Sequence, residues 1–301
     1  MQNSNIYRTS SETLGLAYGF LGVLGFSLTL PATRAAVTDL DPTFVGLGRA
    51  LVASVLAMIV LWVTRQPLPL KKHWGSLLTI AAGVVLGFPL LSAWAMQQLP
   101  ATHGGVIIGL IPLATAITVT IKGRERPSLK FWFASIFGST TVVLFALTSN
   151  TGQFQKEDLV LLGAVVAAAI GYAEGGRLAH ILGGWQVICW ALVIALPILV
   201  IPVTYTVFQH GLVASPTAWL GFSYVSIFSQ FLAFFAWYHG MNISGIARIS
   251  QIQLLQPFLT IVFSGILLGE QITPLMLIVS AMVIASIVLG KQALIKRSPQ
   301  L

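Results

Sequence analysis

Charged side chains are scarce in this chain. Only 8% of its 301 residues are Asp, Glu, Lys or Arg, whereas a soluble domain has about 25%. Because 56% of the residues are hydrophobic, the chain lacks the charge that a water-facing surface needs. We therefore expect an integral membrane protein, with the lipid bilayer as its surroundings.

Cysteine is nearly absent too. Cys189 is the only cysteine, which excludes an intramolecular disulfide. The N-terminal segment also lacks a convincing cleavage pattern of small residues. We therefore expect the first apolar run to be retained as a membrane span.

Long apolar runs fill most of the chain. Runs of about 20 residues, enough to cross roughly 30 Å of hydrocarbon as helix, recur without the strict alternation typical of a membrane barrel. The sequence predicts an all-α integral membrane fold with ten spans, at residues 14–36, 42–64, 75–97, 103–121, 130–148, 159–181, 186–207, 216–239, 246–267 and 273–294.

The net charge of +8 comes largely from basic residues gathered in a few links between spans. These residues follow spans two, four and ten: Arg65, Lys71, Lys72, Lys122, Arg124, Arg126, Lys130, Lys291, Lys296 and Arg297. If spans alternate in direction, all these links lie on one side, and the other side holds little beyond Lys156. The positive-inside rule then predicts both termini in the cytoplasm. The basic charge therefore indicates topology in the cell's inner (cytoplasmic) membrane, and we expect no nucleic-acid partner.

An internal repeat is visible when the sequence is shifted by 145 residues. The shift lays Pro112 on Pro257 and Glu125 on Glu270, so that IPLATAITVTIKGRE faces QPFLTIVFSGILLGE. This match predicts two five-helix repeats, 14–148 and 159–294, joined by SNTGQFQKED. An odd number of spans in each repeat forces the second copy to enter the membrane inverted.

The charges of two corresponding turns support the inversion independently. The turn after span four should be cytoplasmic and basic, and its counterpart after span nine should be external and free of Lys and Arg. They read KGRERPSLK and LGEQITPLM. The sequence therefore favours two inverted halves.

The pattern DPTFVGLGR (41–49), the proline-to-glutamate spacing and the ending LLGE (267–270) resemble the EamA-type branch of the drug/metabolite transporter superfamily. The resemblance covers nearly the whole chain. It implies a ten-helix carrier of a small organic compound, with amino acids and related compounds as the commonest class and export more frequent than import. The second half has no arginine answering Arg49, so a binding site need not be symmetric.

Polar residues follow one stripe of span nine, at the helical spacing Ser250, Gln253, Pro257, Thr260 and Ser264, with Gln256 beside it. Amides that face lipid would leave donors and acceptors unpaired, so this stripe should face protein or water. The glutamines either bond neighbouring helices or line a substrate cavity. Pro112 and Pro257 are expected to break their helices near the middle of the membrane.

Spans three, four and eight offer further candidates. Gly105 and Gly109 have the spacing for close helix approach, which favours packing over binding. Gln230 and Trp237 share a stripe with Ser223 and Ser226, and span three adds Ser92 and Trp94. The two tryptophans either anchor span ends or form the aromatic walls of a pocket for a small amphipathic metabolite.

Charged residues within spans carry the strongest functional signal, because a buried charge needs a partner or water. Arg49 can pair with a substrate carboxylate, pair with Asp39 or Asp41, or reach toward the outer surface. Glu174 and Arg177 stand three residues apart, which favours an ion pair, and they are also candidates for gating or coupling.

Sequence patterns for enzyme chemistry are missing. The histidines and the lone cysteine show no metal-ligand spacing, and no phosphate loop, nucleophile elbow or dinucleotide fingerprint occurs. We predict no catalytic residues, metal or cofactor. The alternative is a membrane-embedded enzyme acting on lipid or isoprenoid phosphates, which would need clustered carboxylates or histidines at one membrane face. A purely structural membrane protein would not explain the polar stripes.

The combined prediction is a secondary transporter that moves a small organic metabolite by alternating access. The expected substrate contacts are Gln253, Gln256, Ser250, Gln230, Trp237, Trp94 and Arg49. The scarcity of acidic residues within spans leaves proton antiport and facilitated diffusion both open. The oligomeric state is also open, and a monomer is compatible with the sequence.

Overall fold

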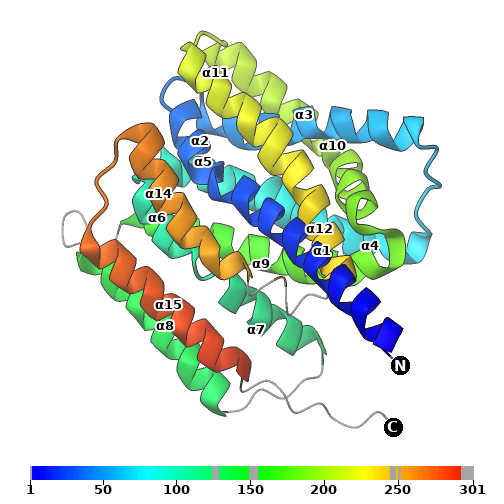
Figure 1. Ribbon diagram of the computed structural model, residues 1–301. Helices are drawn as coiled ribbons and strands as arrows, with labels where there is room; N and C mark the ends of the chain where they lie inside the picture. The colour runs from blue at the N-terminus through cyan, green and yellow to red at the C-terminus, as the bar shows by residue number, and fades with distance from the viewer. Residues whose placement is uncertain (1, 124–128, 149–154, 245–248, 250–251, 293–301) are drawn as a thin grey trace.

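The computed structural model describes residues 2–123, 129–148, 155–244, 249 and 252–292, and these ranges contain helices and no strand (Figure 1). The all-α expectation is therefore confirmed for this part of the chain. The α-helices are α1 Gln2–Ser27, α2 Thr29–Ala36, α3 Pro42–Val63, α4 Trp74–Ile80, α5 Phe88–Met96, α6 Ala101–Ile108, α7 Ile111–Gly123, α8 Leu129–Thr148, α9 Lys156–Leu182, α10 Gly184–His210, α11 Pro216–Ser223, α12 Ala233–Ser244, α14 Gln256–Leu268 and α15 Pro274–Gln292. Four tighter or wider segments interrupt them: the 3₁₀ turns η1 Lys71–His73 and η4 Gln253–Leu255, and the π-helices η2 Ala81–Gly87 and η3 Tyr224–Leu232.

Seven helical stretches within the described ranges are long and apolar enough to cross a membrane: Thr13–Ala36, Pro42–Val63, Lys71–Met96, Ala101–Ile121, Lys156–Leu182, Gly184–His210 and Pro216–Ser244. Three shorter apolar helices, Ile136–Phe145, Gln253–Leu268 and Pro274–Ser286, lie where the sequence predicts spans five, nine and ten. A multi-pass membrane fold follows from the seven. Ten crossings stay a prediction.

The outer surface of the helical bundle is apolar. Large side chains such as Trp62 and Phe208 are 79% and 84% exposed, and many other Leu, Ile, Val and Phe side chains are exposed with them. A soluble protein rarely exposes so much contiguous apolar surface. These side chains therefore face lipid.

The helices contact one another in a symmetric pattern. Three pairs of corresponding spans touch directly: α3 with α10, α6 with α14, and α8 with α15, the last lying side by side in Figure 1. Other contacts come in matched sets, since α1 and α2 pack on α12 and α11 while α9 packs on α4, η2 and α5. A two-fold relation between two halves of the chain would produce this pattern.

Spans four and nine are both interrupted near their middle. Pro112 is the second residue of α7 and Pro257 the second residue of α14, positions where the missing N–H of proline is tolerated. Gly105 and Gly109 face α14 at this point. A Cβ atom on them would lie 3.1 Å from the Thr260 side chain and 3.0 Å from the Pro257 ring. The two glycines therefore allow spans four and nine to approach closely.

Two π-helices lie at corresponding places in spans three and eight. A π-turn is wider than an α-turn and rotates the residues that follow it. Ser226, Ser229 and Gln230 are buried in η3, whereas Ser223 before it is exposed. The predicted stripe through Ser223 is therefore wrong at that residue, because an α-helical period was assumed across a π-helix.

The backbones of η2 and α9 approach each other closely at a glycine. A Cβ atom on Gly83 would stand 2.5 Å from the carbonyl oxygen of Ala167, whereas one on Gly75 meets nothing within 4 Å. We expect Gly83→Ala to lower the free energy of unfolding by about 1–3 kcal/mol through overpacking. Gly75→Ala should leave it unchanged or raise it by up to about 1 kcal/mol. Thermal unfolding in detergent measures both, and equal effects would contradict the described contact.

Candidate functional site

A buried arginine lies at the centre of the bundle. Arg49 of α3 is 1% exposed, and its Nη2 donates a hydrogen bond of 3.0 Å to the Ser229 hydroxyl of η3. Its Nε and Nη1 have no hydrogen-bond partner among the described residues. An uncompensated buried charge destabilises a protein by roughly 3–5 kcal/mol. The fold therefore maintains an unfavourable group in its core.

No carboxylate among the described residues neutralises this charge. The Ser229 hydroxyl also bonds Thr29 at 2.7 Å, and the guanidinium lies within electrostatic reach of Tyr172 and Tyr224. Two of the alternatives raised by the sequence for Arg49 are wrong. It pairs with neither Asp39 nor Asp41, and it does not reach the outer surface, because it points into the bundle core.

Aromatic side chains form one wall beside Arg49. The Tyr172 ring lies 5.7 Å from that of Trp237 and 6.0 Å from that of Phe26, and Phe26 lies 4.9 Å from Phe234. Trp237 is fully buried, and its indole N–H has no acceptor among the described residues. It is therefore no interfacial anchor.

Gln230 supplies the third unpaired group. It is fully buried, and its Nε2 donates to the Val84 carbonyl of η2 at 3.0 Å. That carbonyl fixes the amide orientation, because the reverse orientation would set two acceptors against each other. The Oε1 atom is left without a donor within the described residues. We call Arg49, Tyr172, Ser229, Gln230 and Trp237 the central cluster.

The two glutamines of span nine are buried next to each other. Gln253 Nε2 lies 3.5 Å from Gln256 Oε1, and one turn on the Thr260 hydroxyl donates to the Ser27 carbonyl at 3.0 Å. The stripe therefore faces protein rather than lipid. Ser250 lies outside the described residues.

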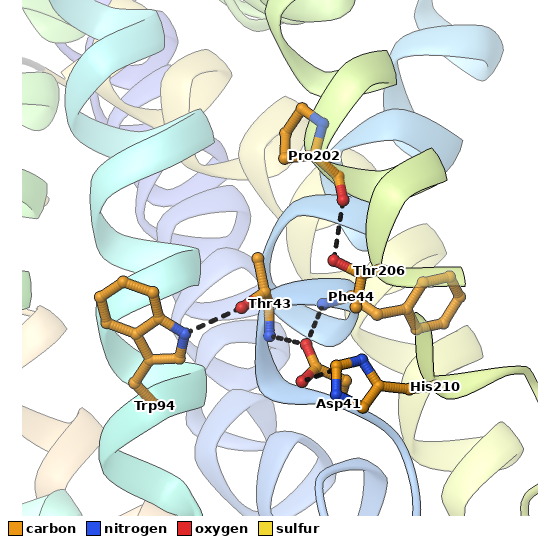
Figure 2. A network of polar contacts seen from close by, with 7 residues as sticks. All are labelled: Asp41, Thr43, Phe44, Trp94, Pro202, Thr206 and His210. Atoms are coloured by element: carbon orange, nitrogen blue, oxygen red, sulfur yellow. Dashed lines mark hydrogen bonds and ion pairs between the residues drawn. The ribbon is translucent and has the colours of Figure 1, made fainter. Parts of the chain in front are cut away.

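Trp94 lies apart from the central cluster. It is 42% exposed, and its indole N–H donates to the Thr43 hydroxyl at 3.2 Å (Figure 2). Figure 2 also shows Asp41 capping α3 by accepting hydrogen bonds from the N–H groups of Thr43 and Phe44. His210 stands 3.8 Å from the same carboxylate. The structure thus places Trp94 at the end of the span, beside a helix cap.

Glu174 and Arg177 form the expected ion pair on α9. Arg177 also donates to the Ser76 hydroxyl of α4 at 2.8 Å. The pair therefore joins two spans at the end of the bundle that lies away from Asp41. A local salt bridge and a gating role both remain compatible with this geometry.

Acidic residues cluster at the end of the bundle where α3 begins. This acidic end contains Asp39, Asp41, Glu157, Asp158 and Glu270. Glu270 accepts hydrogen bonds from the N–H groups of Ala101 and Thr102 at 2.8 and 2.7 Å, which caps α6. The hydroxyl and the N–H of Ser215 hydrogen-bond to Asp39 and hold the pKa of that carboxyl below its usual range.

A buried His–Asp pair also lies at the acidic end. His103 Nε2 of α6 lies 2.8 Å from Asp158 Oδ1 of α9, with both side chains 2% exposed. Asp158 also accepts from the Gln155 N–H at the start of α9. Together with Glu270, this pair ties segments that lie far apart in the sequence.

The described residues hold no group of three His, Cys, Asp or Glu side chains able to bind a metal ion. The unpaired groups of the central cluster are two guanidinium nitrogens, one indole N–H and one amide oxygen. Such groups can bind and orient a small polar molecule, and they do not form an acid–base or nucleophilic constellation.

Comparison with known proteins identifies the chain. The model of the EamA-like transporter family matches it twice, over residues 13–147 and 155–290. The chain belongs to the EamA-like transporter family. A Bacillus subtilis (strain 168) protein named "Uncharacterized transporter YdeK" is 44% identical over 265 residues, covering 87% of this chain and 92% of that one.

Two further comparisons agree with this family. "Uncharacterized transporter YcbK" of Bacillus subtilis (strain 168) is 25% identical over 250 residues, covering 77% of this chain and 78% of that one. One solved crystal structure matches this EamA-like transporter with a TM-score of 0.65 at 15% identity, covering 93% of this chain and 97% of that chain, which shows a shared fold. The protein is thus a multi-pass membrane transporter of the EamA-like family.

Several residues of this EamA-like transporter's site were missed by sequence reasoning. Ser229 lies in the π-helix η3, and the stripe drawn with an α-helical period passed through Ser226 and Gln230 instead. Tyr172 stands two residues before Glu174. The sequence reasoning selected charged residues within this span, so it selected Glu174 and passed over the neutral Tyr172. His103 and Asp158 are 55 residues apart, and no spacing rule connects them.

Ser229 and Ser223 provide a matched test of the site geometry. We expect Ser229→Ala to lower the free energy of unfolding by about 1.5–3 kcal/mol, because Arg49 loses a hydrogen bond to a charged group. Ser223→Ala, on the exposed face of the same span, should change it by no more than about 0.5 kcal/mol. Thermal unfolding of the two variants in detergent measures both changes. Equal effects would place Arg49 away from Ser229.

Proposed function

We propose that the protein is a secondary transporter that moves a small organic metabolite, an amino acid or a related compound, out of the cell by alternating access. The two inverted five-helix halves, 14–148 and 159–294, would move against each other around the central cluster. The membrane would be the cell's inner (cytoplasmic) membrane, with both termini in the cytoplasm.

The observation that carries this proposal is the unpaired polar chemistry of the central cluster. Arg49 comes from α3, and Gln230 and Trp237 come from one span, Pro216–Ser244. All three are at least 99% buried and each keeps a polar atom without a partner in the described part of the chain. Buried polar groups are normally hydrogen-bonded, so unpaired ones point to an absent ligand. Their depth within the spans is where carriers of this general kind bind substrate.

The ties at the acidic end support a gate. Glu270 belongs to the second half and caps α6 of the first, and His103 of the first half bonds Asp158 of α9. We assign this end to the outside, because Arg65, Lys71 and Lys72 follow the opposite end of α3. The described conformation would then be closed toward the outside, and export would require these ties to open.

Glu174 and Arg177 are the proposed gate or coupling pair at the cytoplasmic end. Arg177 bridges α9 to Ser76 of α4, so breaking the pair would free two spans from each other. Gln253 and Gln256 lie in span nine, next to Pro257, and we propose them as further substrate contacts. Pro112 lies at the corresponding interruption of span four. Trp94, near the outer end, would meet substrate only on its release.

The main alternative is a membrane-embedded enzyme acting on lipid or isoprenoid phosphates. Its carboxylates would have to converge on one reaction centre. In the described residues four acidic side chains of the acidic end, Asp39, Asp41, Asp158 and Glu270, instead cap helices, bond His103 or bond Ser215. The transporter explains the buried cluster better.

Ligand binding is the first test of the proposed function. A ligand at one hundred times its dissociation constant should stabilise the folded protein by about 2.7 kcal/mol. We expect some amino acids or related metabolites to raise the unfolding temperature of the purified protein. The same compounds should show saturable flux in proteoliposomes. If no compound does either, the proposed function is wrong.

Glu174→Gln tests gating and coupling. In proteoliposomes we expect it to reduce flux driven by an imposed pH gradient to the level seen without the gradient, because the amide cannot release a proton. Glu157→Gln, in the first turn of α9, is the control and should leave the flux unchanged. A gradient-driven flux that survives in Glu174→Gln would remove Glu174 from the coupling mechanism. Wild-type flux that ignores the gradient would indicate facilitated diffusion.

A further inference from the structure

We propose that the end of the bundle around the start of α4 binds the headgroup of an anionic phospholipid. The link from α3 to α4, which carries two lysines, lies at the edge of the bundle (Figure 1). We call Lys71, Lys72 and Arg177 the cationic patch. The inference goes beyond the proposed function and does not depend on what the protein transports.

Lys72 and Arg177 come from different spans and lie near the same point. Arg177 of α9 donates a hydrogen bond of 2.8 Å to the Ser76 hydroxyl of α4. The 3₁₀ turn η1 continues directly into α4, with helical backbone at Trp74. Lys72 and Ser76, four residues apart, therefore stand about one helical turn from each other. The two cations thus gather at one end of α4.

The cationic patch is accessible and keeps a net positive charge. Lys71 and Lys72 are exposed, and the Arg177 side chain is 56% exposed although it also pairs with Glu174. Glu174 is the one acid in the segments 64–80 and 170–182, which hold Arg65 besides the patch. The positive charge therefore exceeds what Glu174 neutralises, which favours an anionic partner such as the acidic lipids of a cytoplasmic leaflet.

Apolar side chains beside the cations match the rest of a lipid. Leu70, Trp74 and Leu78 are 62%, 46% and 50% exposed, and Trp74 and Leu78 share one face of α4. The indole N–H of Trp74 donates to the Pro69 carbonyl at 3.1 Å, which orients the ring. Tryptophan is typical of the membrane–water interface. A lipid phosphate at the cationic patch would therefore place its acyl chains along Trp74 and Leu78.

The chemistry of the cationic patch narrows the headgroup. Arginine and lysine both bind phosphate oxygens. Phosphatidylcholine also carries a phosphate, but its headgroup ends in a cation that the patch would repel. Phosphatidylglycerol carries the same phosphodiester and ends in neutral hydroxyls, so the patch should prefer it. Inorganic phosphate would meet the cations but leave the apolar side chains without a partner.

Lipid titration of the purified full chain tests the inference without a transport substrate. In dodecyl maltoside at low salt, we expect dioleoyl phosphatidylglycerol to raise the unfolding temperature, because a ligand of the folded state stabilises it. Dioleoyl phosphatidylcholine and inorganic phosphate should not, since one has no net charge and the other has no acyl chain. Sodium chloride at about 0.5 M should weaken the effect by screening.

Variants assign the binding to the cationic patch. Lys72→Gln and Arg177→Gln should each raise the lipid concentration that gives half of the temperature shift roughly fivefold, the effect of one cation near an anionic membrane. Glu174→Gln breaks the same ion pair as Arg177→Gln but keeps the cation, so it should keep or strengthen the shift. Lys156→Gln removes a positive charge from an exposed site at the acidic end and should behave as wild type.

Several outcomes would overturn the inference. Equal shifts by the two lipids would do so, and so would an unchanged half-point in both Lys72→Gln and Arg177→Gln, or a loss in Lys156→Gln as large as theirs. A shift by inorganic phosphate as large as that by the lipid would replace the lipid with a free anion. If Arg177→Gln fails to fold, Lys72→Gln and the wild-type series still decide. Because no flux is measured, a failure here leaves the proposed function standing.

Discussion

The structure depends on a single uncompensated charge held in the middle of an apolar bundle. Hydrocarbon outside and close-packed helices inside both oppose a free guanidinium, and yet Arg49 is enclosed with the Ser229 hydroxyl as its one hydrogen-bond partner in the described part of the chain. Such an arrangement costs stability. Buried polar groups are normally hydrogen-bonded, so the unpaired atoms of Arg49 are the feature that the proposed binding site explains.

Polar contacts between helices lie at both ends of the bundle that encloses Arg49. At the acidic end, Glu270 and the His103–Asp158 pair join segments that lie far apart in the chain by hydrogen bonds. At the other end, Glu174 and Arg177 connect α9 to α4 through Ser76. Between the two ends, spans three, four, eight and nine are interrupted by π-helices, prolines or short 3₁₀ turns. The regular helices are thus interrupted at the depth of the central cluster.

Much of this architecture could be predicted from the sequence, because the bilayer imposes simple rules. Span lengths follow from its thickness, and the burial of Gln253 and Gln256 follows from the cost of amides in lipid. The partners of individual side chains were harder to predict. Ser223 was placed on the wrong face because a π-helix shifts the register without a sequence signal. Arg49 was given carboxylate partners that instead cap α3 or bond Ser215, since helix capping and tertiary contacts compete for the same acids.

The α8–α15 contact has a consequence for the two halves of the chain. These two helices lie side by side, and each belongs to a different half. A half expressed alone would leave that helix without its neighbour, as well as leaving α3 without α10. A half expressed alone would therefore need a second copy of the same half to cover these two helices.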